Sequence, residues 1–264
     1  MTAITIPPGV IVSEWIKLRS VRSTYLTMLG AILFAVVLGM FNTSSVASNW
    51  ATMTAQDRAS FDAVGDSLAG FQLGELAFGV LGVLAISSEY GTGMIRATLT
   101  AVPRRGTVFA AKALVVGAIT LVLGELFVFA TFFLGQLMLS GKHLDVSLAD
   151  PGVLRTLASS GLYLLVVTMV GFGLGAIIRH STGAVAALFG LVWLVYPVGR
   201  ALESWSYVPD RLLLTNAANV LGQVNTPVGN AALRVPSLGL AYLNLAMYLI
   251  VFLGLGAWRV SQDV

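Results

Sequence analysis

The sequence predicts an all-α polytopic membrane protein with six transmembrane helices, an amphipathic helix before the first and re-entrant helices between the fifth and sixth. Three observations support this fold class. Apolar residues make up 57% of the 264 residues and charged residues only 10%, whereas soluble domains carry about 25% charged residues. The mean hydropathy is +0.88. Six segments are also long enough to cross a hydrocarbon core of about 30 Å, which takes about 20 helical residues. We therefore treat residues 1–264 as a single transmembrane domain.

The amphipathic helix is predicted at residues 10–22, after two prolines and a glycine. Its apolar side chains, which include Ile11 and Leu18, fall on one side of a helical wheel, and its polar ones fall largely opposite. Such a helix suits the headgroup region of a membrane, with its basic residues near anionic lipid. The expected interfacial anchors are Trp15, Lys17, Arg19 and Arg22. The alternative is a plain cytoplasmic extension of the first span.

The predicted spans, in order, are residues 24–41, 68–88, 108–139, 154–178, 183–201 and 238–258. The third is longer than a bilayer needs and is expected to tilt, kink or project beyond it. Lys and Arg are more frequent on the side of the N-terminus, whereas most acidic loop residues lie on the other side. By the positive-inside rule, both termini are predicted to be cytoplasmic, in a multi-pass protein of the cytoplasmic membrane.

Two connections between spans are distinctive. Residues 89–107 join the second and third spans with glycines, a proline and several basic residues, and we expect this segment to contact another protein. The alternative is that its basic residues only fix topology and meet lipid phosphates. Residues 204–237 carry short apolar pieces between polar residues, and these are too short to cross a bilayer. They predict either re-entrant helices or an ordinary extracellular loop.

Polar residues inside the predicted spans are the next candidates, because a charge near the bilayer centre costs about 2.5–3.5 kcal/mol on insertion scales. Glu125 lies in the middle of the third span, and Glu75 and Gln72 lie in the second. One interpretation is that either carboxylate contacts a cation or a polar group of a substrate. The other is structural, with each carboxylate neutral or paired against a neighbouring helix. The sequence leaves both open.

Several chemistries are excluded. The chain has no cysteine, which rules out disulfides and thiolate metal sites. Its two histidines are too few for a histidine-rich metal site, and neither lies well within a span beside a serine. There is no G-x-x-x-x-G-K-[ST] phosphate-binding loop, and no basic stripe with interleaved aromatic residues that would indicate nucleic acid binding. We expect no catalytic residue, cofactor or metal in this chain.

The local pattern in the second connection is Glu89-Tyr90-x-Thr92-Gly93-x-Ile95-Arg96-x-Thr98-Leu99, followed by Pro103-Arg104-Arg105 and Lys112. With an amphipathic helix and six spans around it, this pattern resembles ABC-2-type permeases, the membrane subunits of ATP-binding cassette exporters. The run Ser13-Glu14-Trp15-Ile16-Lys17-Leu18-Arg19-Ser20 also looks like the start of many actinobacterial members.

The resemblance implies a type V exporter fold, in which two membrane subunits, here expected as a homodimer, surround a central pathway. Two copies of a separate ATPase subunit would bind ATP and Mg²⁺ beneath them. Residues 89–107 would form the coupling helix that docks on the ATPase, and residues 10–22 the elbow helix. The residues implied in coupling are Glu89, Tyr90, Gly93, Met94, Ile95, Arg96, Leu99, Pro103, Arg104 and Arg105.

The resemblance further implies that the second and fifth spans line the pathway. Its aromatic candidates are Phe71, Phe78, Phe189, Trp193 and Tyr196, which would favour export of an amphipathic or hydrophobic substrate, although they could equally be packing residues. Two other function classes stay open. One is a secondary transporter driven by an ion gradient. Many such transporters contain internal repeats, and the chain shows no convincing one, which argues against this class. The other is a non-transport membrane scaffold or immunity protein.

Overall fold

The computed structural model describes residues 7–20, 22–101, 104–201, 211–224 and 235–262. Within these ranges the chain is helical and has no strand. Six helices are long and apolar enough to cross a membrane, which confirms the predicted all-α fold with six spans. They are α2 (Arg22–Asn49), α5 (Phe71–Thr92), α7 (Arg105–Ser140), α8 (Val153–Ile178), the continuous run of α9 (Ser181–Phe189), η1 (Gly190–Leu194) and α10 (Val195–Ala201), and α14 (Leu238–Ser261).

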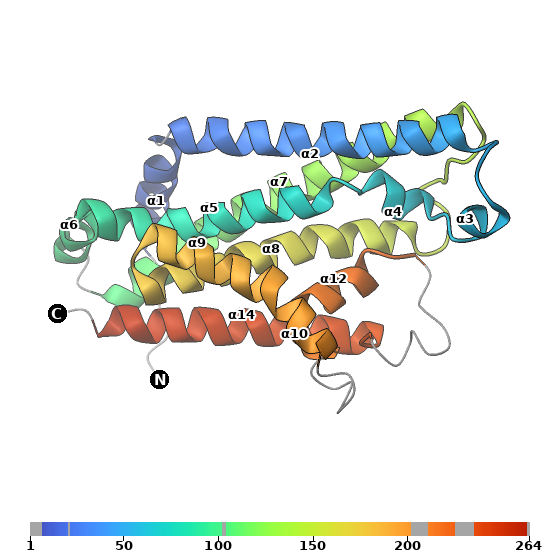
Figure 1. The fold of residues 1–264 in the computed structure, drawn as a ribbon. Coiled ribbons are helices and arrows are strands. Elements are labelled where there is room, and N and C mark those ends of the chain that lie inside the picture. Colours follow the sequence, from blue (N-terminus) through green and yellow to red (C-terminus); the bar gives the residue numbers. More distant parts are fainter. Residues whose placement is uncertain (1–6, 21, 102–103, 202–210, 225–234, 263–264) are drawn as a thin grey trace.

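Helix α8 is the centre of the bundle. It packs against α5, α7, α9 and α14, while α2 and α14 lie along opposite sides of the bundle (Figure 1). Most of α8 is buried inside the protein. Glycines allow this close packing, because a Cβ on Gly82 of α5 would overlap the carbonyl oxygen of Thr168, and a Cβ on Gly173 of α8 would overlap that of Phe252. Small residues that let helix backbones approach are typical of membrane bundles.

Helices α1 (Pro8–Ser20) and α6 (Met94–Ala101) lie at one end of the bundle, where α5 ends and α7 begins (Figure 1). We call this the α1/α6 end. Helix α1 stands at a steep angle to α2 and packs against the start of α7. Gly93 separates α5 from α6 with a φ of 72°, in the left-handed region that favours glycine. This residue therefore allows the chain to leave the spanning helix and start a new, short one.

In the described part of the chain, the short helices α3 (Ala55–Ala59), α4 (Ala63–Ser67) and α12 (Leu214–Leu221) lie at the opposite end. The backbone N–H of Val64 donates to the side chain of Asp62, which caps α4. Burial raises the pKa of the Asp66 carboxyl in the same helix, by more than the hydrogen bond from Asn42 lowers it.

Helix α12 packs against α8, η1 and α14. With eight residues, it rises only about 12 Å and cannot cross a bilayer. The Thr215 hydroxyl donates to the carbonyl oxygen of Val192, at 2.6 Å, and so ties α12 to the π-helical segment η1. That α12 is re-entrant, and that α1 lies in the membrane interface, remain predictions.

Candidate functional site

Four charged side chains meet inside the α1/α6 end. They are Glu14 and Lys17 of α1, Glu89 of α5 and Lys112 of α7, and we call them the charge cluster. Glu14, Glu89 and Lys112 are almost fully buried, with 0%, 3% and 2% of their surfaces exposed. The Lys112 ammonium lies 2.8 Å from the Glu89 carboxylate and also donates to Glu14. The Lys17 ammonium lies 2.6 Å from Glu14 and 3.3 Å from Glu89.

The charge cluster is electrically balanced, with two carboxylates facing two ammonium groups. Burial by itself would lower the pKa of Lys17, but its hydrogen bond to Glu14 and the charges of Glu89 and Glu14 outweigh burial, so its pKa lies above the ordinary value. A buried ion pair adds little net stability compared with apolar residues, yet breaking one costs about 3–5 kcal/mol, because a charge is left unpaired. The four residues therefore depend on one another.

The charge cluster also reaches α6. The Lys17 ammonium donates to the Thr98 hydroxyl of α6 at 3.0 Å. Because the same ammonium pairs with Glu14 and Glu89, one lysine connects α1, α5 and α6, and Lys112 adds α7. A hollow of about 250 Å³ beside the cluster is lined by Leu18, Leu81 and Met94, among others. The short helix α6 is thus fastened to three longer elements rather than hanging from a flexible loop.

A second set of contacts ties α8 and α14 to this end. The guanidinium of Arg179, at the end of α8, lies 5.3 Å from the centre of the Tyr90 ring and donates to the carbonyl oxygen of Arg259 in α14. Arg105, at the start of α7, donates to the carbonyl oxygen of Ser261, at 3.1 Å. Arg179 has a φ of 62° and ends α8 in the left-handed conformation. These contacts join the ends of α5 and α7 to those of α8 and α14.

The residues predicted for coupling divide into a buried and an exposed group. Glu89 lies buried in the charge cluster, and the ring of the half-buried Tyr90 contacts the guanidinium of Arg179. Met94 is 44% exposed, and Arg104 is exposed. Gly93 is also exposed, in the turn between α5 and α6, whereas Ile95 and Arg105 are half-buried. Pro103 and the side chains of Arg96 and Leu99 lie outside the described part of the structure.

The interfacial anchors also differ among themselves. Trp15 is 48% exposed, and Arg19 is exposed as well. Lys17 instead points into the charge cluster, on the side of α1 that faces the protein. The side chain of Arg22 lies outside the described part. Helix α1 therefore turns Glu14 and Lys17 toward the protein and leaves apolar residues such as Ile16 exposed, which is suited to contact with lipid.

The sequence analysis did not place Glu14 and Lys112 in the site. A signal exists for the carboxylates: Glu14 is the one acidic residue of segment 10–22, and Glu89 is the one acidic residue of segment 89–107. Two isolated carboxylates among so many basic residues indicate pairing. Their burial, however, depends on contacts between residues 98 positions apart, which helical periodicity does not reveal.

Among the residues predicted within the spans, several pack inside this subunit. Phe78 is fully buried and packs against Phe127, as does Phe71. Glu75 is buried and accepts a hydrogen bond from the Tyr163 hydroxyl of α8. The structure therefore places Glu75 in an interhelical contact.

The other span candidates are more accessible. Gln72 is exposed, and Tyr196 is half-buried. Phe189 stacks on Trp193, with ring centres 5.7 Å apart. The Glu125 carboxyl lies against Gly161 of α8, where a Cβ would overlap it, and it borders a shallow apolar hollow on the outer face of α7. One of its oxygens has no hydrogen-bond partner among the described residues.

Residues 10–196 match the family described as ABC-2 family transporter protein. The chain belongs to this family. The match runs from α1 into α10 and includes every residue of the charge cluster. No curated protein matches the chain. As an ABC-2 permease, the protein is a membrane component of a transporter, and the family implies an ABC ATPase subunit as its partner.

Proposed function

We propose that this ABC-2 permease exports an amphipathic or hydrophobic substrate across the cytoplasmic membrane, with ATP hydrolysed by a separate nucleotide-binding subunit. The observation that carries the proposal is the charge cluster, which joins the short helix α6 to α1, α5 and α7. In the proposed assembly two permeases pair, and two ATPase subunits bind ATP and Mg²⁺ and dock on the α1/α6 ends. Both termini are then cytoplasmic.

The exposed surface of α6 has the features of a small docking site. Met94 presents an apolar side chain, and Arg104 adds positive charge a short distance along the chain. Interfaces commonly combine an apolar anchor at the centre with charged residues at the rim. Gly93 directs α6 away from the axis of α5, so that α6 projects from the end of the bundle (Figure 1).

Force applied to α6 would be transmitted through the charge cluster. An attachment made only by a flexible loop would absorb a displacement, whereas the buried ion pairs resist separation because each unpaired charge is costly. ATP-driven closure of the two ATPase subunits would thus move α5 and α7 together with α6. The permease supplies an element with two conformations, and the substrate binds them with different affinities.

The test is co-purification of tagged permease in nanodiscs, followed by mass spectrometry of bound proteins. We compare wild type with Met94→Asp combined with Arg104→Glu, which removes the apolar anchor and reverses one charge. Lys142→Glu, an exposed charge reversal in the turn after α7, is the matched control. An ATPase with a phosphate-binding loop should accompany wild type and the control but be lost from the double variant.

Two outcomes would contradict the proposal. If no such ATPase accompanies wild type while other membrane complexes of the host survive the purification, the proposed ATPase partner of this permease is contradicted. If the ATPase remains bound to the double variant, the docking surface lies elsewhere than α6. Chemical crosslinking of the purified complex would also count the permeases, and one copy per complex would contradict the homodimer.

A further inference from the structure

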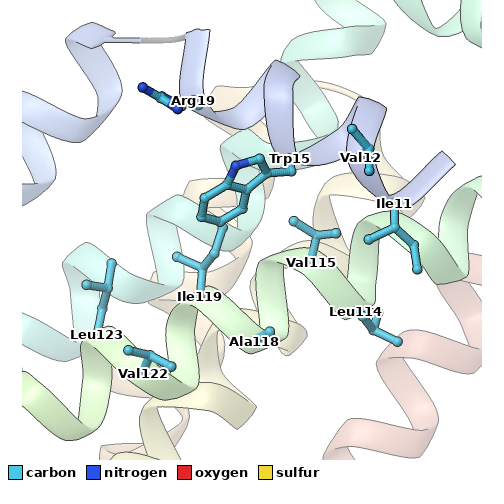
Figure 2. Close-up of a pocket in the computed structure, with 10 residues that line it drawn as sticks. All are labelled: Ile11, Val12, Trp15, Arg19, Leu114, Val115, Ala118, Ile119, Val122 and Leu123. Carbon is cyan, nitrogen blue, oxygen red and sulfur yellow. The ribbon is translucent and has the colours of Figure 1, made fainter. Parts of the chain in front are cut away.

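A groove lies between α1 and the outer face of α7, separate from the charge cluster. Figure 2 shows its walls, with Ile11 and Trp15 of α1 above Val115 and Ile119 of α7. Its volume is about 730 Å³, and its lining is almost wholly apolar. Along α7 it extends from Leu114 to Leu123, which corresponds to about 14 Å of helix.

The groove opens to the side of the bundle. Leu114 and Val122 on its floor are both more than half exposed, and Trp15 is 48% exposed. Helix α7 is one of the six candidate spans, and the exposed apolar side chains on its outer face suit contact with hydrocarbon. An elongated apolar groove of this kind, between α1 and α7, is complementary in shape and chemistry to an acyl chain.

The charge at the rim indicates the headgroup. Arg19 stands at the end of the groove, and its guanidinium points away from α7 in Figure 2. It has no ion-pair partner among the described residues, although Lys17, two positions earlier, has two. A guanidinium next to an apolar groove is complementary to the phosphate of a lipid whose acyl chain lies in the groove.

A second copy of this chain fits the rim less well. In the described part of the chain, the acidic residues of the α1/α6 end are Glu14 and Glu89, and both are buried in the charge cluster. A second α1/α6 end would therefore bring further basic residues toward Arg19, and like charges repel. The charge distribution favours an anionic lipid over a second copy.

We propose that this groove holds an acyl chain of an anionic phospholipid whose phosphate pairs with Arg19. The lipid then holds α1 from outside through Trp15 and Arg19, while the charge cluster holds it from inside through Glu14 and Lys17. Lipid binding at this site stabilises the position of the helix that supports α6. The inference does not rest on the proposed function, since the site is complete without an ATPase or a substrate.

The experiment uses quenching of Trp15 fluorescence in reconstituted vesicles. The chain has five tryptophans, so the Trp15 signal is the difference between wild type and Trp15→Phe. Vesicles of phosphatidylcholine receive increasing amounts of dibrominated phosphatidylglycerol or, in parallel, dibrominated phosphatidylcholine. We expect roughly fivefold tighter apparent binding of the anionic lipid, because a basic residue near an anionic surface contributes about that factor.

Two pairs of variants locate the site. Arg19→Gln should abolish the preference for phosphatidylglycerol. Arg259→Gln, which removes a charge of α14 at the α1/α6 end of the bundle, should keep it. Ala118→Phe fills the floor of the groove and should remove most Trp15 quenching by either lipid. Ala130→Phe makes the same change at another exposed position of α7 and should leave quenching unchanged.

Three results would overturn the inference. Equal quenching by the two lipids means that Trp15 meets only ordinary annular lipid. An equal loss of preference in Arg19→Gln and Arg259→Gln means that the overall surface charge, rather than a site, attracts the lipid. Absence of quenching by either lipid, together with a crosslink between two copies at Trp15→Cys, means that a second permease occupies the groove.

Discussion

Replacing Lys112 by methionine removes the most deeply buried cation of the charge cluster while keeping a side chain of similar length. In wild type, Glu14 and Glu89 face two ammonium groups. The substitution leaves two buried carboxylates with Lys17 alone, so one negative charge loses its counterion. We expect a loss of about 3–5 kcal/mol in the free energy of unfolding, the range for breaking a buried pair.

A second substitution tests the cause of this loss. In Lys112→Met combined with Glu89→Gln, one carboxylate again faces one ammonium group, and balance is restored. The double variant should therefore be more stable than Lys112→Met alone, with a coupling of about 1–3 kcal/mol between the two sites. Unfolding titrations in mixed detergent micelles measure these differences. Lys142→Met, which removes an exposed lysine, is the control and should change stability by less than about 0.5 kcal/mol.

The reasoning is refuted if Lys112→Met is as stable as wild type, because the buried carboxylates then need no counterion. It is also refuted if the two substitutions destabilise additively, because packing rather than charge would then explain the loss. Lys112→Arg gives a further check, since it keeps the charge and should lose less stability than methionine at this position.

Three more predictions concern other parts of the bundle. Gly82→Ala should destabilise the protein by about 1–3 kcal/mol because its methyl group overlaps a carbonyl of α8, whereas Gly254→Ala, with open space around it, should unfold like wild type. Asp66→Asn should be slightly more stable than wild type at pH 7, by under about 1 kcal/mol in the free energy of unfolding, which thermal unfolding scans measure. Burial raises the folded-state pKa of Asp66, so the cost of its charge disappears as pH falls below that pKa, and the advantage of asparagine should fade in the same scans at acidic pH. Thr215→Val should cost about 1 kcal/mol in micelle unfolding, because the carbonyl of Val192 loses its hydroxyl donor, and no change would mean that α12 is not held there.

The sequence was sufficient to predict the all-helical fold with six spans, because apolar segments of bilayer length have few other solutions. The family, too, was recognisable from the residues between Glu89 and Lys112. The direction of the side chains was harder to predict. A helical wheel separates the two faces of α1 but does not say which of them meets protein, and Lys17 lies on the face that does.

The candidate site was predictable only in outline for the same reason. Met94, directly after Gly93, and Arg104, at the start of α7, are exposed, as a docking segment requires. Glu89 looked equally available in the sequence, but it is buried between two lysines that come from other helices. Pairing across distant segments depends on how the helices pack, and the local pattern carries no information about it.

The charge cluster also has a consequence for biogenesis. Glu14 and Lys17 leave the ribosome early, Glu89 follows near the end of the second span, and Lys112 comes last, 98 residues after Glu14. Until Lys112 has been synthesised, two carboxylates have one lysine between them. Helix α1 can therefore complete its ion pairs only after the start of α7 has joined the first two spans, and a nascent chain that stops before residue 112 has one lysine for two carboxylates.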